Sequence, residues 1–158
     1  MTAALLTPTP TEVHSAALAG SGAATISAVY RCNFPEWLGL WLYYTGAGAS
    51  GAPHVRVLVS SQADEPSSAD LTLWHDLGCY DGSVTAQDWL STGPVNLHEI
   101  LIGGELIRLR ATGSAEIAQK TVAMRAPQAK WVHVRVAEIG NTGAPGTLVV
   151  KLSTIGAR

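Results

Sequence analysis

The sequence predicts an all-β protein, an antiparallel two-sheet β-sandwich for which a jelly roll is the most economical form, with an extended N-terminal arm. Eight short apolar segments alternate with clusters of Gly, Pro, Ser, Asn and Asp, a spacing typical of all-β domains. The C-terminal stretch "KWVHVRVAEI" alternates with a period of two, as a strand with one buried face does. No long amphipathic helical pattern is present, so the crossover helices that parallel sheets need are lacking.

In chain order, residues 1–23 are rich in Ala, Thr, Pro, Ser and Gly, and we expect them to form the arm, followed by a single domain over residues 24–158. The expected strands are 24–31, 36–44, 54–61, 71–78, 105–112, 116–124, 130–139 and 147–155. "TAQDWL" at 85–90 suits one helical turn, and "VNLHEILI" at 95–102 is ambiguous between a helical turn and a loop.

Alternation within the strands predicts the core. The residues expected there are Val55, Val57, Val59, Ile107, Leu109, Val132, Val134, Val136, Leu148, Val150 and Leu152.

The strand "EWLGLWLYYTG" is apolar on both faces, because Leu side chains alternate with Trp37, Trp41 and Tyr43. Either a loop or the arm covers the aromatic side within one chain, or another subunit does.

A second row of unusual outward positions is Trp131, His133 and Arg135. Trp beside Arg is enriched at protein interfaces, and a flat ring with polar neighbours can also stack on a sugar. Three readings stay open for this row: packing within the chain, a subunit contact and a glycan site.

Composition narrows the partners. Charged residues make up 14% of the chain and the formal net charge is −2, so the surface is unusually neutral for a soluble domain. The ten Lys and Arg residues form no basic block, which argues against nucleic acid as a partner. The N-terminus has neither the pattern of a signal peptide nor that of a membrane span, and we expect Cys32 and Cys79 to be reduced.

Candidate chemistry is sparse. The stretch "LWHDLGCYDGS" carries four groups that could bind a metal, but their spacing matches no known metal motif, and turn chemistry explains the two Asp residues. His98 and Glu99 lack a nucleophile motif, and no phosphate loop, nucleophile elbow or HExxH pattern is present. We therefore expect no enzyme activity, no catalytic residues, no metal and no cofactor.

The C-terminal hairpin "APQAKWVHVRVAEIGNTGAPGTLVVKLS" and the central "WLGLWLYYTGAGASGAPHVRVLVSSQADEP" resemble small jelly-roll β-sandwich structural proteins of tailed bacteriophages. The resemblance covers about residues 24–155 and consists of strand and turn patterns rather than invariant motifs. It implies a virion protein that decorates or cements a capsid, or a minor head or tail component.

Further expectations follow from this resemblance. The protein would be made in the host cytoplasm and reside on the capsid surface, with the major capsid protein and copies of itself as partners. A homo-oligomer is expected, a trimer being favoured because such proteins often occupy three-fold positions. The contact candidates are the two rows Trp37, Trp41, Tyr43 and Trp131, His133, Arg135. The same sandwich plan occurs in carbohydrate-binding modules, so a module used in host attachment is the alternative.

Overall fold

The computed structural model describes residues 2–19, 24–46, 52–79, 100–102, 105–107, 117–139 and 144–157. Within these ranges the chain forms strands and one short 3-10 helix, without an α-helix. The strands form two main sheets and one small sheet, and nearly all pairings are antiparallel. The predicted all-β antiparallel two-sheet sandwich is confirmed, whereas the jelly-roll form stays a prediction.

The first main sheet has the order β1–β4–β12–β6–β7, and β3 also pairs with β12. Its strands are β1 (Ala4–Leu5), β3 (Thr25–Ile26), β4 (Tyr30–Arg31), β6 (Ala52–Ser60), β7 (His75–Asp76) and β12 (Trp131–Ile139). The long ladder joins β12 to β6 without a break, from Trp131 opposite Ser60 to Ile139 opposite Ala52. This ladder fixes which side chains share each face of the sheet.

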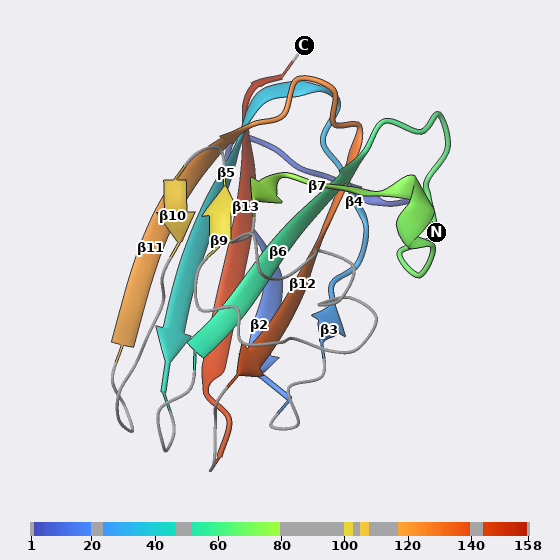
Figure 1. The fold of residues 1–158 in the computed structure, drawn as a ribbon. Helices are drawn as coiled ribbons and strands as arrows, with labels where there is room; N and C mark the ends of the chain where they lie inside the picture. Colours follow the sequence, from blue (N-terminus) through green and yellow to red (C-terminus); the bar gives the residue numbers. More distant parts are fainter. Residues whose placement is uncertain are drawn as a thin grey trace.

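The second main sheet has the order β11–β5–β13–β2. Its strands are β2 (Thr11–Ala17), β5 (Pro35–Thr45), β11 (Ile117–Arg125) and β13 (Thr147–Ala157). Figure 1 shows β6 and β12 of the first sheet running obliquely across β5 and β13 of the second. The small sheet holds β8 (Gly78–Cys79), β9 (Ile100–Ile102) and β10 (Glu105–Ile107), so part of the ambiguous stretch 95–102 is a strand.

The core lies between the two main sheets and follows the predicted alternation. Eight of the expected core residues are buried, namely Val55, Val57, Val132, Val134, Val136, Leu148, Val150 and Leu152. Val59 is partly buried against the same cluster, while the side chain of Ile107 and all of Leu109 lie outside the described part. Inward residues of β5 complete the cluster, namely Leu38, Leu40, Leu42 and Tyr44.

The described N-terminal residues, 2–19, are built into the two main sheets, and a separate N-terminal arm is not confirmed. β1 joins the first sheet and β2 forms an edge of the second, and Leu6, Val13 and Leu18 are buried in the core. The β2–β13 ladder shifts register between Val150 and Lys151, which marks a β-bulge or irregularity. Such a shift disturbs simple alternation, and this explains why the segment shows little periodicity in the sequence.

Residues 71–78 differ from the single strand that the sequence predicts. They form the 3-10 helix η1 (Leu71–Leu73) followed by the short strands β7 and the start of β8. Asp70 caps the helix, because its carboxylate accepts hydrogen bonds from Thr72 N at 3.1 Å and from Thr72 Oγ1 at 2.6 Å. A capping carboxylate stabilises a helical turn over an extended strand at this point.

One buried polar network ties the two sheets together. Glu138 on β12 accepts hydrogen bonds from the Tyr44 hydroxyl and from Gly146 N, each at 2.8 Å. Burial and the bond to Glu138 raise the pKa of the Tyr44 phenol, so the hydroxyl stays a donor. A Cβ atom at Gly146 would lie 2.4 Å from the Tyr44 ring, so only glycine fits beside it.

Candidate functional site

The outer face of the β11–β5–β13–β2 sheet carries the first predicted row of aromatic residues. Trp37, Trp41 and Tyr43 alternate with the buried leucines of β5 and therefore point away from the core. Opposite Trp41 lie Thr121 of β11 and Lys151 of β13, and opposite Tyr43 lies Val149. We call this outer surface the aromatic face.

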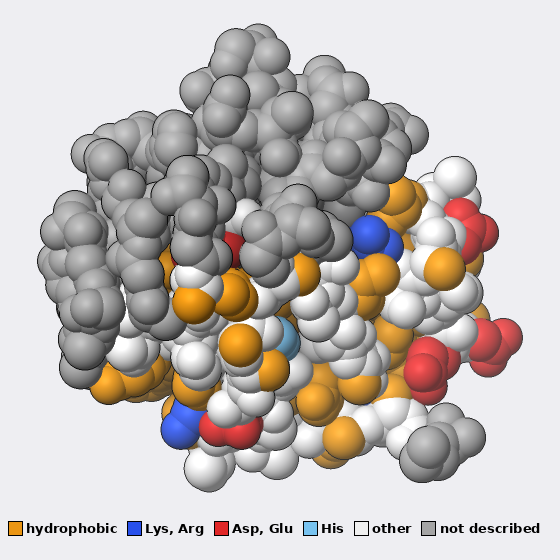
Figure 2. Space-filling model, turned by 90° about the horizontal axis from the view of Figure 1, so that it is seen from below, with side chains coloured by type: hydrophobic (Ala, Val, Ile, Leu, Met, Phe, Trp, Pro, Cys, Tyr) orange, Lys and Arg blue, Asp and Glu red, His pale blue; other side chains and the backbone are white. Residues whose placement is uncertain are grey.

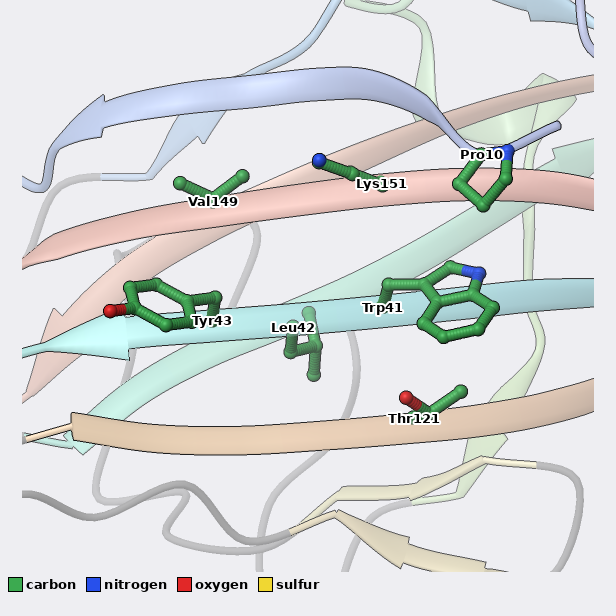
Figure 3. A pocket seen from close by; sticks show the side chains of 7 residues that line it. All are labelled: Pro10, Trp41, Leu42, Tyr43, Thr121, Val149 and Lys151. Atoms are coloured by element: carbon green, nitrogen blue, oxygen red, sulfur yellow. The ribbon is translucent and has the colours of Figure 1, made fainter.

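Two rings on the aromatic face are open to solvent in the single chain. Trp41 is 44% exposed and Tyr43 is 37% exposed. They line a groove of about 390 Å³ together with Pro10, Leu42, Thr121, Val149 and Lys151. Figure 3 shows both rings lying flat along the sheet, with Thr121 on one side and Val149 and Lys151 on the other. Of the two alternatives for these rings, cover within the chain or cover by another subunit, the described residues do not provide the first at Trp41 and Tyr43.

The indole of Trp41 is held in place by the sheet below it. Its Nε1 donates a hydrogen bond to Ser153 Oγ at 3.4 Å. Gly39 makes room for this arrangement, since an added Cβ would lie 2.5 Å from Ser153 Oγ and 3.5 Å from Trp41 Nε1. Because its polar atom is satisfied within the sheet, the exposed ring surface is apolar and partly preorganised.

The apolar surface continues toward the start of β5, where Trp37 lies. Trp37 is partly buried and has the Arg125 guanidinium 5.8 Å from its ring centroid, within the range of a cation–π contact. Ile155, opposite Trp37 on β13, is 52% exposed. The aromatic face is therefore a stripe of large apolar side chains rather than a single hydrophobic residue.

Charge is scarce around this stripe. Lys151 is the only charged side chain among the described residues that line the groove. Figure 2 shows one end of the molecule, where a few acidic and basic side chains lie among hydrophobic side chains and a larger area of other side chains and backbone. The low charged fraction of the sequence is thus visible on the described surface.

The second predicted row lies on the outer face of the other main sheet, and the chain itself covers it. Trp131 and Arg135 are each 6% exposed and His133 is 0% exposed. The cover is the connection between β6 and β7, residues 61–74, which we call the covering loop. The structure thus realises packing within the chain, one of the three readings of this row, and leaves these three side chains little surface for a partner or a glycan.

Hydrogen bonds from the sheet to the covering loop hold it in place. Trp131 Nε1 donates to Gln62 O and Arg135 Nη2 donates to Ser68 O, each at 2.8 Å. The Lys130 ammonium donates to Ala63 O. These three bonds link side chains of the sheet to backbone carbonyls of the loop.

The last residue of the covering loop packs on the buried histidine. The rings of Trp74 and His133 lie 4.2 Å apart between centroids and are tilted by 51°. Neither ring nitrogen of His133 has a hydrogen-bond partner within the described ranges. Burial, and then the charges of Arg135 and Arg56, lower the pKa of His133 to about 3. The imidazole is therefore neutral and serves as a packing group.

The residues considered for catalysis or metal binding do not form a site in the described part of the chain. His75 is exposed, and the described residues hold no group of three or more His, Cys, Asp or Glu side chains placed for a metal ion. The side chains of Asp76 and Cys79, and all of Asp81, His98 and Glu99, lie outside the described residues. Cys32 is free and buried, and burial raises the pKa of its thiol to about 12, which suppresses the thiolate.

A second groove, of about 370 Å³, lies at the start of β7 and is lined by Val59, Ser60, Ser61, His75, Leu77, Arg125, Ala126, Pro127, Gln128 and Ala129. It combines one imidazole and one guanidinium with small uncharged side chains, and no carboxylate or thiol lines it. The hydroxyls of Ser60 and Ser61 line it together with the imidazole of His75.

Sequence reasoning identified the rings of the aromatic face but not their neighbours. Val149 and Lys151 alternate with Leu148, Val150 and Leu152, so the period of β13 already places them on the outer face. Their position beside Tyr43 and Trp41 depends on strand order and register, which a single sequence does not specify.

No protein-family model matches the chain, and no curated protein matches it. Nor does any helix in the described ranges combine the length and apolar character needed to cross a membrane.

Proposed function

We propose that the protein is a non-enzymatic structural protein of a virion that decorates or cements the capsid of a tailed phage. It is made in the host cytoplasm and binds the major capsid protein and copies of itself. The observation that carries this proposal is the aromatic face, an apolar stripe that stays exposed on an otherwise well-packed sandwich. Apolar stripes of this kind on soluble domains mark surfaces that associate with other molecules.

The chemistry of the face supports adhesion rather than a reaction. Trp41, Tyr43 and Val149 offer apolar contact area, and Thr121 and Lys151 add polar contacts at the edges. Aromatic residues are enriched in the cores of protein interfaces, where charged residues are depleted. The edge strand β2 lies in the same sheet and extends such a contact.

A carbohydrate-binding module used in host attachment remains the second candidate, because one specific observation favours it. Two aromatic rings that lie flat along the sheet and line a groove of about 390 Å³ form a surface on which a sugar can stack. Trp131 is buried, so under this candidate the sugar would stack on Trp41 and Tyr43 instead.

Locating the protein in the particle tests the first proposal. We expect a cryo-EM map of purified phage particles to show density of this size and shape on the capsid surface, and mass spectrometry to find the chain in those particles. Absence of the chain from purified particles would overturn the proposal. A glycan array distinguishes the second candidate: it should be blank, whereas binding that Trp41→Ala abolishes with the fold intact would favour the carbohydrate module.

A further inference from the structure

We infer that the aromatic face packs against the same face of a second copy of the chain, around a two-fold axis. The inference rests on the proposed function, since it names which of the proposed partners occupies this surface. A second copy of the chain occupies the aromatic face, and the major capsid protein binds elsewhere on the assembly.

The aromatic face is large enough for a specific interface between two copies of the chain. Four strands spaced about 4.8 Å apart, with strands of about 30 Å, give the face a flat area of roughly 600 Å². The length corresponds to the nine residues of β11, and β5 and β13 are longer, at eleven residues each. Two such faces together reach the lower end of the range for specific interfaces, about 1,200 Å² in total. A whole sheet face is therefore enough for a stable dimer, while the groove alone is not.

The shape of the aromatic face suits packing against a second sheet. Sheets that pack face to face lie about 10 Å apart, and the side chains of the two faces fill the space between them. The rings of Trp41 and Tyr43 lie along the sheet, and the hydrogen bond from Trp41 to Ser153 limits how far the indole can move. A face that is already ordered loses little side-chain entropy when a second copy covers it.

The aromatic face carries charges of both signs. Lys151 has no ion pair with another described side chain, and Glu12 of β2 is the residue opposite it in the ladder. Both side chains are exposed. Charges of both signs on one face avoid the like-charge repulsion that would result if the face carried a single sign. The aliphatic stem of Lys151 can also cover apolar surface while its ammonium group reaches solvent.

Symmetry determines how the aromatic face can meet the same face of a second copy. A surface can meet its own copy only around a two-fold axis, and two-fold dimers are the commonest oligomers. The trimer that the phage resemblance implies would instead bring this face against a different surface of the neighbouring copy. The mass of the assembly therefore tests the inference directly.

The experiment measures mass by light scattering over a range of concentrations of the full chain. We expect twice the mass of one chain. Trp41→Asp places a charge at the centre of the contact and should raise the dissociation constant about 30-fold or more, the effect of losing an interface hot spot. Thr121→Arg provides a second test, because Thr121 is exposed and the longer side chain blocks the face without disturbing the core. Circular dichroism checks that both variants fold.

Leu5→Asp is the matched control. Leu5 is 52% exposed and lies on β1 in the other main sheet, so the same change from an apolar to an acidic residue should leave the dimer intact. A monomer at every concentration, a trimeric mass, or a dimer that persists in both aromatic-face variants would overturn the inference. Binding of a glycan to a monomeric protein would overturn it as well. A monomer that is still found in phage particles would refute this contact and leave the proposed function standing.

Discussion

The two outer faces of the sandwich begin from similar sequence patterns and end in opposite states. On β12, Trp131, His133 and Arg135 alternate with buried valines, and the covering loop leaves each of them at most 6% exposed. On β5, Trp41 and Tyr43 alternate with buried leucines, yet they remain 44% and 37% exposed. Alternation therefore identifies which residues leave the core, but it does not determine whether another part of the chain covers them.

The difference arises from the connection between β6 and β7. The covering loop contains Ser67 and Trp74, and the Trp74 indole donates a hydrogen bond to Ser67 O at 2.8 Å, which folds the loop back on itself. The folded loop buries an apolar cluster of Leu58, Trp74 and Trp131 that is separate from the main core. The described residues supply no comparable segment over Trp41, and this is why we assign a partner to that face.

The largest expected effect comes from removing the cover. Trp74→Ala should lower the free energy of unfolding by about 3 kcal/mol, because a buried indole is lost and a cavity remains over His133. Trp41→Ala, the same change on the aromatic face, should cost about 1 kcal/mol or less at concentrations where the chain is monomeric. Urea denaturation at low protein concentration measures both values.

Equal losses in the two variants would contradict the comparison. They would mean that Trp41 contributes as much to the single chain as Trp74 does, and that the exposed ring has no need of a partner.

The sequence was sufficient for the long strands and for most of the core, because both follow from a period of two, but not for residues 71–78. Val132, Val134 and Val136 illustrate this, since all three are buried as expected. The sequence was insufficient where contacts link distant positions. The cover over His133 comes from Trp74, 59 positions earlier in the chain, and no local pattern indicates this pairing.

The candidate site shows the same limit. Trp41 and Tyr43 were identified from their alternation, but Pro10 reaches the same groove only because β2 pairs with β13 beside β5. The register shift in that pairing lies between Val150 and Lys151. Such irregularities depend on the packing of whole sheets, so they cannot be derived from one segment at a time.

The second prediction uses pH to loosen the covered face. The ordinary histidine pKa is 6.5, and burial with Arg135 and Arg56 lowers that of His133 to about 3. Below pH 6.5 the unfolded chain binds a proton that the folded chain excludes, so stability falls as the pH drops toward 3. Between about pH 7 and about pH 4.5 the His133 contribution to this loss should be on the order of 2 kcal/mol.

The control is His133→Phe, which keeps a ring beside Trp74 and removes the titration. His14, whose pKa is lowered mainly by burial, is present in both proteins, so its contribution cancels in the difference. We expect the unfolding free energy of the variant to depend less steeply on pH than that of the unchanged protein. Parallel pH profiles would show that His133 does not titrate on unfolding.

The smallest expected effect compares one hydrogen bond on each face. Trp131 Nε1 donates to Gln62 O at 2.8 Å beneath the covering loop, whereas Trp41 Nε1 donates to Ser153 Oγ at 3.4 Å on the aromatic face.

Trp→Phe removes the donor in each case and keeps an aromatic ring. At position 131 it removes a short hydrogen bond to the Gln62 carbonyl, which should cost about 1 kcal/mol. At position 41 the bond that is lost is long and therefore weak, so the cost should be below about 0.5 kcal/mol. Urea denaturation of the two variants measures both costs, and hydrogen exchange should show faster opening of residues 61–74 in Trp131→Phe alone. A larger loss from Trp41→Phe than from Trp131→Phe would reverse the assignment of covered and exposed faces.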